Sequence, residues 1–303
     1  MACTRPLIAL DLGIINGKRK IKILPKRDNL YSMESLTSRY DKSKLLYLPC
    51  GSCISCRIAK SKEWAVRCVL EAKAYKSNFF ITLTYNNASC PEKLDKEALT
   101  KFLKKLQRLY PGMRYFACGE YGSKNGRPHY HAILFNFDPP DLTCLGKTKN
   151  GYYFESKSIN AAWSHGYVML ADFSYHTAAY IARYTMKKLL SDDKKDEFLV
   201  MSLKPGIGAS YFEKNYKAIY SDDVIYGKFG NSFKAPIPRY FDKLLERIDI
   251  ELFTKIKSER LSCANLDHID YMIKHNLHHY EEVYDHKDKA NILKYKKLAG
   301  RRL

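Results

Sequence analysis

The pattern of apolar and polar residues predicts a regular series of elements in the middle of the chain. Residues 79–85 (FFITLTY) are β-branched and aromatic, which is typical of a buried strand. Asp95 then occupies the N-cap position of a predicted helix that extends to about Leu109, with apolar residues every three or four positions. The Pro-Gly pair at 111–112 predicts the end of that helix.

The next segment predicts a β-hairpin. Its two strands cover 114–120 and 129–137, and a turn over 122–128 joins them. The elements predicted after the hairpin are a short helix, a strand and a longer helix, at 159–164, 167–171 and 174–190. This order of strand, helix, hairpin, helix, strand and helix predicts an α+β fold, in which a four- or five-stranded antiparallel sheet carries helices on one face.

The flanking sequence is less regular. We expect loops and short strands before residue 49 and a helix at 62–75. Beyond 191 the charge rises, and a helix is predicted at 240–257. The chain is therefore expected to contain a Cys-rich N-terminal region, a central α+β core and a basic C-terminal region, at 1–75, 76–190 and 191–303.

The charge balance favours a polyanionic partner. The 303 residues include 52 Lys and Arg against 32 Asp and Glu, which gives a net charge of +20. Such an excess favours contacts with phosphates and the release of counterions, as in nucleic-acid binding. No apolar run approaches the roughly 18 residues of a membrane span, and residues 1–10 lack the apolar part of a signal peptide. We therefore expect a soluble cytosolic protein without a membrane partner.

A His-x-His pair on the second hairpin strand is a candidate metal site. His129 and His131 are two residues apart, so both imidazoles project from one face of a strand. Glu120 ends the preceding strand, and the hairpin can bring its carboxylate beside them. Two nitrogens and one oxygen suit Mg²⁺ or Mn²⁺, and Mn²⁺ is the better match to imidazole. The alternative is a histidine pair satisfied by surface hydrogen bonds.

Two tyrosines lie four residues apart in the last predicted helix of the core. Tyr180 and Tyr184 therefore share one face, Lys188 continues that row, and Lys187 follows Tyr184 by three positions. A phenol is a weak nucleophile at neutral pH, and a neighbouring cation steadies a phosphate or lowers the phenol's pKa. The alternative is an amphipathic helix with two partly buried tyrosines.

The cysteines suggest a second metal site. Their number, nine, is odd, which argues against a disulfide framework. Cys50, Cys53 and Cys56 repeat a CxxC spacing, and both Cys3 and Cys68 are candidates for a fourth thiolate. Four thiolates suit a structural Zn²⁺ ion. An iron–sulfur cluster and free thiols near DNA are the alternatives.

Three segments, in this order along the chain, resemble the motifs of HUH-type replication initiators. They are 80–85 (FITLTY), 128–131 (PHYH) and 180–188 (YIARYTMKK). Further segments resemble the initiators of gokushoviruses, a branch of the Microviridae, which are small phages with single-stranded DNA. These are 1–6 (MACTRP), 48–57 (LPCGSCISCR), 64–68 (WAVRC) and 204–208 (KPGIG). The similarity of the first of them makes Cys3 the preferred fourth zinc ligand.

The resemblance implies a HUH endonuclease core on a ferredoxin-like sheet, with a divalent ion on the central hairpin. Carried onto this sequence, His129, His131 and Glu120 bind the ion, and Tyr180 and Tyr184 are paired nucleophiles. The implied activity is a nick in one strand of circular viral DNA at the origin, through a 5′-phosphotyrosine intermediate, with later rejoining in rolling-circle replication.

Further expectations concern charge and partners. Arg183, Lys187 and Lys188 are expected to stabilise phosphate charge, and the basic terminal regions to contact single-stranded and supercoiled circular DNA around the origin. Host polymerase and helicase are the expected partners, in the host bacterial cytoplasm. Two other functions fit the same residues. One is a plasmid relaxase or HUH transposase, and the other is a zinc-stabilised nucleic-acid-binding protein without catalysis.

Overall fold

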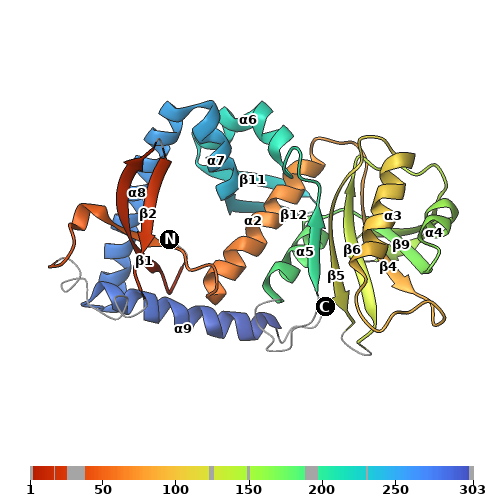
Figure 1. The fold of residues 1–303 in the computed structure, drawn as a ribbon, viewed down its shortest axis with the longest axis horizontal. Helices are drawn as coiled ribbons and strands as arrows, with labels where there is room; N and C mark the ends of the chain where they lie inside the picture. Colours follow the sequence, from red (N-terminus) through yellow and green to blue (C-terminus); the bar gives the residue numbers. More distant parts are fainter. Residues whose placement is uncertain are drawn as a thin grey trace. The chain divides into compact units, whose positions relative to one another are not determined.

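The computed structural model describes residues 3–16, 18–25, 38–122, 126–148, 151–187, 197–229 and 231–299. They form two compact units (Figure 1). The terminal unit comprises Met1–Ala59 and Lys257–Leu303, and the central unit comprises Lys60–Ile256. These contact-based boundaries differ from the three regions expected from the sequence, at 1–75, 76–190 and 191–303. Two helices, α2 (Ile54–Ala72) and α8 (Ile250–His275), contain a boundary between the units.

The central unit is built on a seven-stranded sheet with the order β10-β5-β6-β4-β9-β8-β7, in which all neighbours are antiparallel. The strands are β4 (Asn78–Tyr85), β5 (Arg114–Tyr121), β6 (Pro128–Phe135), β7 (Leu142–Thr148), β8 (Gly151–Ser156), β9 (Gly166–Asp172) and β10 (Phe198–Met201). Its helices are α3 (Lys96–Leu109), α4 (Lys157–Trp163) and α5 (Tyr175–Lys187).

The order of elements predicted from the sequence is confirmed in this unit. Strand β4, helix α3, the β5–β6 hairpin, helix α4, strand β9 and helix α5 follow one another along the chain. Strand β6 lies between β4 and β5, the two strands that α3 connects, and β9 lies on the other side of β4. This is the split βαβ order of the ferredoxin-like arrangement.

The expectation that helices cover one face of the sheet is wrong for the whole unit. Helices α3 and α4 pack on one face, where Tyr130, Ala132 and Leu134 of β6 are buried. Helices α2 and α5 pack on the other, where Ile133 and Phe135 are buried (Figure 1). Because β6 is apolar on both sides, each side must be covered to remove it from water.

The sheet is also wider than predicted. The region expected to form a loop at 139–150 contains β7, and β10 pairs with the edge strand β5. In β7 most side chains are partly or fully exposed, so it lacks the apolar alternation that identifies a strand in a sequence. Strand β10 contains only four residues, Phe198–Met201, which is too short for a periodic signal.

The rest of the central unit forms a third apolar cluster. Buried residues of α2, among them Val66 and Leu70, contact Phe212, Phe241 and Leu245 in this cluster. The elements involved are α6 (Ala209–Ser221), β11 (Val224–Phe229), β12 (Asn231–Pro236) and α7 (Arg239–Ile248). The helix predicted at 240–257 is thus two helices, α7 and α8, which meet at Asp249.

The terminal unit contains a three-stranded antiparallel sheet with the order β2-β1-β3. Its elements are β1 (Leu7–Ile15), β2 (Lys18–Ile23), the 3₁₀ helix η2 (Lys42–Lys44), β3 (Leu45–Leu48) and α9 (Tyr280–Ala299), together with parts of α2 and α8. Among the described residues, the apolar cluster beside the sheet has Ile8 and Leu24 as its buried members. No helix within the described ranges has both the length and the apolar character needed to cross a membrane.

Candidate active site

The β5–β6 hairpin brings the predicted metal ligands together. Its register places Glu120 opposite His129 and Cys118 opposite His131. Because alternate side chains of a strand share a face, Glu120 and both histidines project from the sheet face that α2 and α5 cover. One ligand atom from each of the three side chains lies within 4.8 Å of the other two.

Both imidazoles point at the same carboxylate oxygen. The Nε2 atom of His129 lies 2.8 Å from Oε1 of Glu120, and the Nε2 atom of His131 lies 2.9 Å from it. The side chains of Glu120 and His131 are only 4% and 8% exposed. A carboxylate removed from water to this extent needs a compensating charge, which a cation between the three groups would supply.

The opposite ring nitrogens contact the protein. The Nδ1 atom of His129 lies 3.1 Å from the carbonyl oxygen of Arg127, and the Nδ1 atom of His131 lies 3.0 Å from Oγ1 of Thr82. A carbonyl oxygen only accepts hydrogen bonds, so Nδ1 of His129 carries a hydrogen. In a neutral ring, Nε2 then directs a lone pair at Glu120, an arrangement that suits a shared metal ion.

The distances fit a divalent ion of the Mg²⁺ or Mn²⁺ type. Metal–ligand distances of about 2.1 Å place neighbouring ligands of an octahedral ion about 3 Å apart. The contacts of 2.8 and 2.9 Å between the imidazole nitrogens and the Glu120 oxygen are close to that spacing. Two imidazoles and one carboxylate match Mn²⁺ better than Mg²⁺, because Mg²⁺ prefers oxygen ligands.

Helix α5 positions the first of the predicted tyrosines at this cluster. The side of the helix that packs on the sheet contains Ala178, Ile181 and Ala182, all of which are buried. The hydroxyl group of Tyr180 donates a hydrogen bond of 3.1 Å to Oε1 of Glu120. Its ring meets that of His131 edge to face, with centroids 5.1 Å apart. The guanidinium carbon of Arg183 lies 5.3 Å from the centre of the Tyr180 ring.

Comparison with known proteins places this site in a family context. A family model described as replication-associated protein ORF2 matches residues 78–189. Replication-associated protein ORF2 of Spiroplasma virus 4 is 37% identical over 268 residues, which cover 82% of this chain and 81% of the relative. The chain belongs to the family of phage replication-associated proteins. This confirms the family resemblance predicted from the sequence.

Two further relatives have the same kind of name. Replication-associated protein VP4 of Bdellovibrio phage phiMH2K is 30% identical, covering 71% of this chain and 74% of the relative. Replication-associated protein ORF4 of Chlamydia phage 1 is 27% identical, covering 72% of this chain and 60% of the relative. No solved structure matches the chain. In this phage replication-associated protein, the match to the family model extends from the first residue of β4 to just beyond α5 and includes the whole cluster.

The remaining predicted residues of the helix are less fully described. Tyr184 and Lys187 belong to α5, but their side chains are outside the part that the structure describes. Lys188 lies outside the described residues altogether. The pairing of Tyr180 with Tyr184 and the roles of both lysines therefore stay predictions.

Three residues around the histidines were not predicted from the sequence. Thr82 contacts His131, Arg127 contacts His129 through its backbone, and the ring of Phe80 stacks on that of His131 with centroids 5.5 Å apart. Thr82 and Phe80 lie in a segment that the sequence did single out as a motif. Their contacts follow from the pairing of β4 with β6, which no local pattern encodes.

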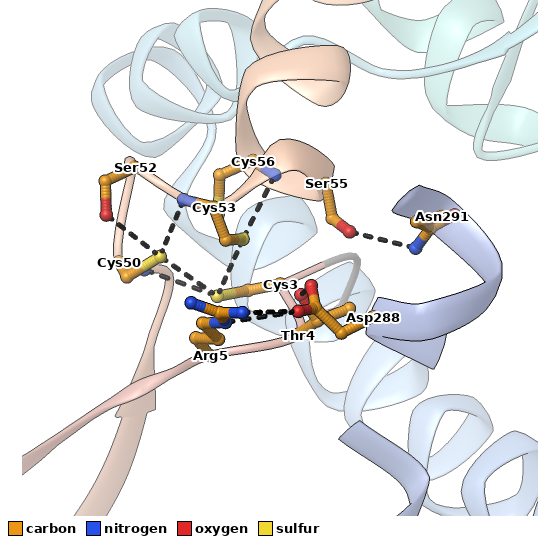
Figure 2. A network of polar contacts seen from close by, with 10 residues as sticks. All are labelled: Cys3, Thr4, Arg5, Cys50, Ser52, Cys53, Ser55, Cys56, Asp288 and Asn291. Carbon is orange, nitrogen blue, oxygen red and sulfur yellow. Dashed lines mark hydrogen bonds and ion pairs between the residues drawn. The ribbon is translucent and has the colours of Figure 1, made fainter. Parts of the chain in front are cut away.

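The predicted thiolates gather in the terminal unit of this replication-associated protein. The Sγ atoms of Cys3, Cys50, Cys53 and Cys56 lie within 4.8 Å of one another (Figure 2). The alternative fourth thiolate, Cys68, is fully buried in the apolar cluster between α2, α5 and the sheet. The structure therefore brings Cys3, and not Cys68, into the group.

Hydrogen bonds alter the acidity of one of these thiols. Burial acts to raise the pKa of Cys53, but hydrogen bonds from the backbone N–H groups of Cys56 and Thr4 outweigh it and lower the pKa to about 6. The N–H group of Cys56 lies 3.4 Å from Sγ of Cys53. Such donors favour the thiolate form, which is the form that binds metals.

Proposed function

We propose that this protein initiates rolling-circle replication by nicking one strand of a circular phage DNA at its origin. The proposal is supported above all by the convergence of three groups on Oε1 of Glu120, namely Nε2 of His129, Nε2 of His131 and the hydroxyl of Tyr180. The family supplies the setting of phage DNA replication. A nucleophile beside three metal-binding groups is the combination that phosphodiester cleavage requires.

His129, His131 and Glu120 would hold a Mg²⁺ or Mn²⁺ ion. When bound, the ion would act as a Lewis acid that polarises the scissile phosphate and neutralises the charge that develops on it. The contacts of the two Nδ1 atoms with Arg127 and Thr82 would keep both imidazoles turned toward that place.

Tyr180 would be the nucleophile. Its hydroxyl donates to Glu120, so the phenol proton already faces a carboxylate that can accept it. The phenol oxygen then bonds to phosphorus while the bond from phosphorus to the 3′ oxygen breaks. The 3′ oxygen takes up a proton from solvent and leaves as a hydroxyl group, and the DNA 5′ phosphate stays on the tyrosine.

The second tyrosine and the neighbouring cations complete the proposal. After one round of synthesis from the 3′ hydroxyl, Tyr184 would cut the regenerated origin, and the new 3′ hydroxyl would attack the first phosphotyrosine to close the circle. Because the phosphotyrosine bond conserves the free energy of the phosphodiester, this exchange needs no ATP. Arg183, Lys187 and Lys188 would stabilise phosphate charge, and a host polymerase and helicase would extend and unwind the DNA.

The tyrosine assignment can be tested with a 5′-labelled or 3′-labelled single-stranded origin oligonucleotide. With Mn²⁺, the unaltered protein should form a covalent adduct with the 3′ fragment of the cut strand, and peptide mapping should locate it on Tyr180 or Tyr184. Tyr180→Phe combined with Tyr184→Phe should abolish the adduct and leave DNA binding unchanged. Tyr175→Phe, at the start of the same helix, is the matched control and should retain the adduct. An adduct in the double variant would end the assignment.

Removal of the metal provides a second test. A chelator should stop nicking, and added Mn²⁺ should restore it, because the phosphate is not polarised without a cation. His129→Ala and His131→Ala should each lower the nicking rate by at least about a hundredfold, the scale on which loss of a key stabilising group acts. Their DNA affinity should stay at the level of the unaltered chain. Nicking that continues at the same rate in chelator would contradict the metal assignment.

A further inference from the structure

The four cysteines of the terminal unit lie in two separate segments of the chain. Cys3 precedes β1, whereas Cys50, Cys53 and Cys56 lie between the end of β3 and the first turn of α2. Sγ of Cys3 is 3.7 Å from Sγ of Cys50 and 3.8 Å from Sγ of Cys53 (Figure 2). The folded chain therefore brings thiols from both segments to one point.

These sulfur distances discriminate between the possible sulfur sites. A disulfide bond needs about 2.05 Å between sulfurs, which is far less than 3.7 Å. A tetrahedral ion with Zn–S bonds of about 2.3 Å separates its four sulfurs by about 3.8 Å. An iron–sulfur cube would hold them further apart, because each thiolate binds a different iron atom. The observed spacing matches a single tetrahedral ion.

The surroundings of the sulfurs suit negative charge. Backbone N–H groups donate to three of them, from Cys50 to Cys3 at 3.4 Å, from Cys53 to Cys50 at 3.2 Å, and from Cys56 to Cys53 at 3.4 Å. A zinc ion with four thiolates has a net charge of about −2. N–H donors around the sulfurs and the N-terminus of α2 stabilise such a charge.

Residues adjacent to the cysteines hold the C-terminal helix α9. Both Thr4 and Arg5, which follow Cys3, bind the carboxylate of Asp288, and Nη2 of Arg5 lies 2.8 Å from its Oδ2. Ser55, between Cys53 and Cys56, accepts a hydrogen bond of 2.9 Å from Nδ2 of Asn291 (Figure 2). Both contact points on α9 therefore depend on chain segments that the cysteines position.

We propose that Cys3, Cys50, Cys53 and Cys56 bind one structural zinc ion, and that this ion fixes the contacts by which the terminal unit holds helix α9. The four thiols bind as thiolates and release their protons to solvent. The apolar cluster beside the three strands has Ile8 and Leu24 as its buried members in the described part of the unit. A unit with so small a core gains much of its stability from a metal cross-link.

Metal content tests the site directly. The full chain, purified under reducing conditions and dialysed against a weak chelator, should contain one zinc ion that Cys53→Ser with Cys56→Ser removes. Cys144→Ser with Cys263→Ser is the matched control, since both residues are exposed and outside the group, and should keep the ion. His129→Ala with His131→Ala should also keep it, which separates this site from the active site. Equal zinc in the two cysteine variants, or iron with acid-labile sulfide in the unaltered chain, would overturn the proposal.

A spectroscopic measurement on the unaltered chain covers the case in which the serine variant does not fold. Co²⁺ added in place of zinc should give thiolate-to-cobalt charge-transfer absorption that saturates at one equivalent, because two imidazoles and a carboxylate produce no such band. A titration without that absorption would contradict the thiolate site.

The link to α9 is tested by hydrogen exchange. Zinc removal, or the Cys53→Ser and Cys56→Ser variant, should speed amide exchange around Asp288 and Asn291 at least about tenfold and leave α3 unchanged. Asp288→Asn should speed exchange in α9 while it retains zinc. Unchanged exchange in α9 after loss of zinc would refute the second part of the proposal.

Discussion

At the scale of the residue, each histidine of the candidate site contacts the protein through both ring nitrogens. The Nε2 atoms lie at Glu120, and the Nδ1 atoms lie at a backbone carbonyl and at Thr82. Contacts to the nitrogen that does not face the ion fix the orientation of the ring and increase its basicity as a ligand. The geometry of the cluster therefore depends on β4 as well as on the hairpin that contains the histidines.

Replacement of Thr82 by valine tests this dependence. Valine has the same shape but no hydroxyl group, so His131 loses its Nδ1 partner, and Mn²⁺ affinity should fall about tenfold or more in calorimetric titrations. Thr84→Val is the control on the same strand, because the Thr84 hydroxyl contacts the carbonyl of Tyr167 at 3.4 Å. If both variants bind Mn²⁺ as tightly as the unaltered chain, the Thr82 contact does not position the ligand.

At the scale of the element, helix α3 shows how a local signal fixes a boundary. The side chain of Asp95 accepts hydrogen bonds from the N–H groups of Glu97 and Ala98, at 2.8 and 3.0 Å. The helix then buries Leu99, Phe102, Leu103 and Leu106 against the sheet. The cap and the apolar stripe were both predicted from the sequence, because they involve residues only a few positions apart.

Loss of this cap should lower stability measurably. Asp95→Ala should reduce the free energy of unfolding by about 1 kcal/mol, because two N–H groups of the first turn lose their partner. Asp95→Asn, whose side chain retains a capping oxygen, should stay close to the unaltered chain. The measurement is the midpoint of urea unfolding, followed by a signal from the central unit. An alanine variant as stable as the asparagine variant would contradict a stabilising cap.

At the scale of the whole molecule, the net charge of +20 separates DNA binding from chemistry. Binding to phosphates draws on many basic side chains and releases counterions, whereas cleavage depends on a few groups at one point. The two activities should therefore respond differently to salt and to substitution.

Salt titration makes this difference measurable. If the chain contacts about three phosphates of single-stranded DNA, its affinity should fall about tenfold or more between about 50 mM and 200 mM salt. His129→Ala with His131→Ala should leave this slope unchanged in fluorescence anisotropy, because neither imidazole belongs to the excess of Lys and Arg. A slope near zero would argue against binding through phosphate contacts.

The sequence alone determined the features that depend on neighbours along the chain. The order of elements from β4 to α5, the cap of α3, the i and i+2 spacing of the histidines and the family resemblance all follow from short segments. The metal-binding set of Glu120, His129 and His131 was also predicted, because a hairpin connects its members and a tight turn limits how the two strands can pair.

Only the tertiary structure decided the features that join distant segments. Coverage of the second sheet face by α2, the addition of β10 at the edge, the contact of Thr82 with His131 and the choice of Cys3 over Cys68 all depend on such contacts. The physical reason is that burial and pairing energies are shared between segments far apart in the chain, so neither segment carries the signal by itself.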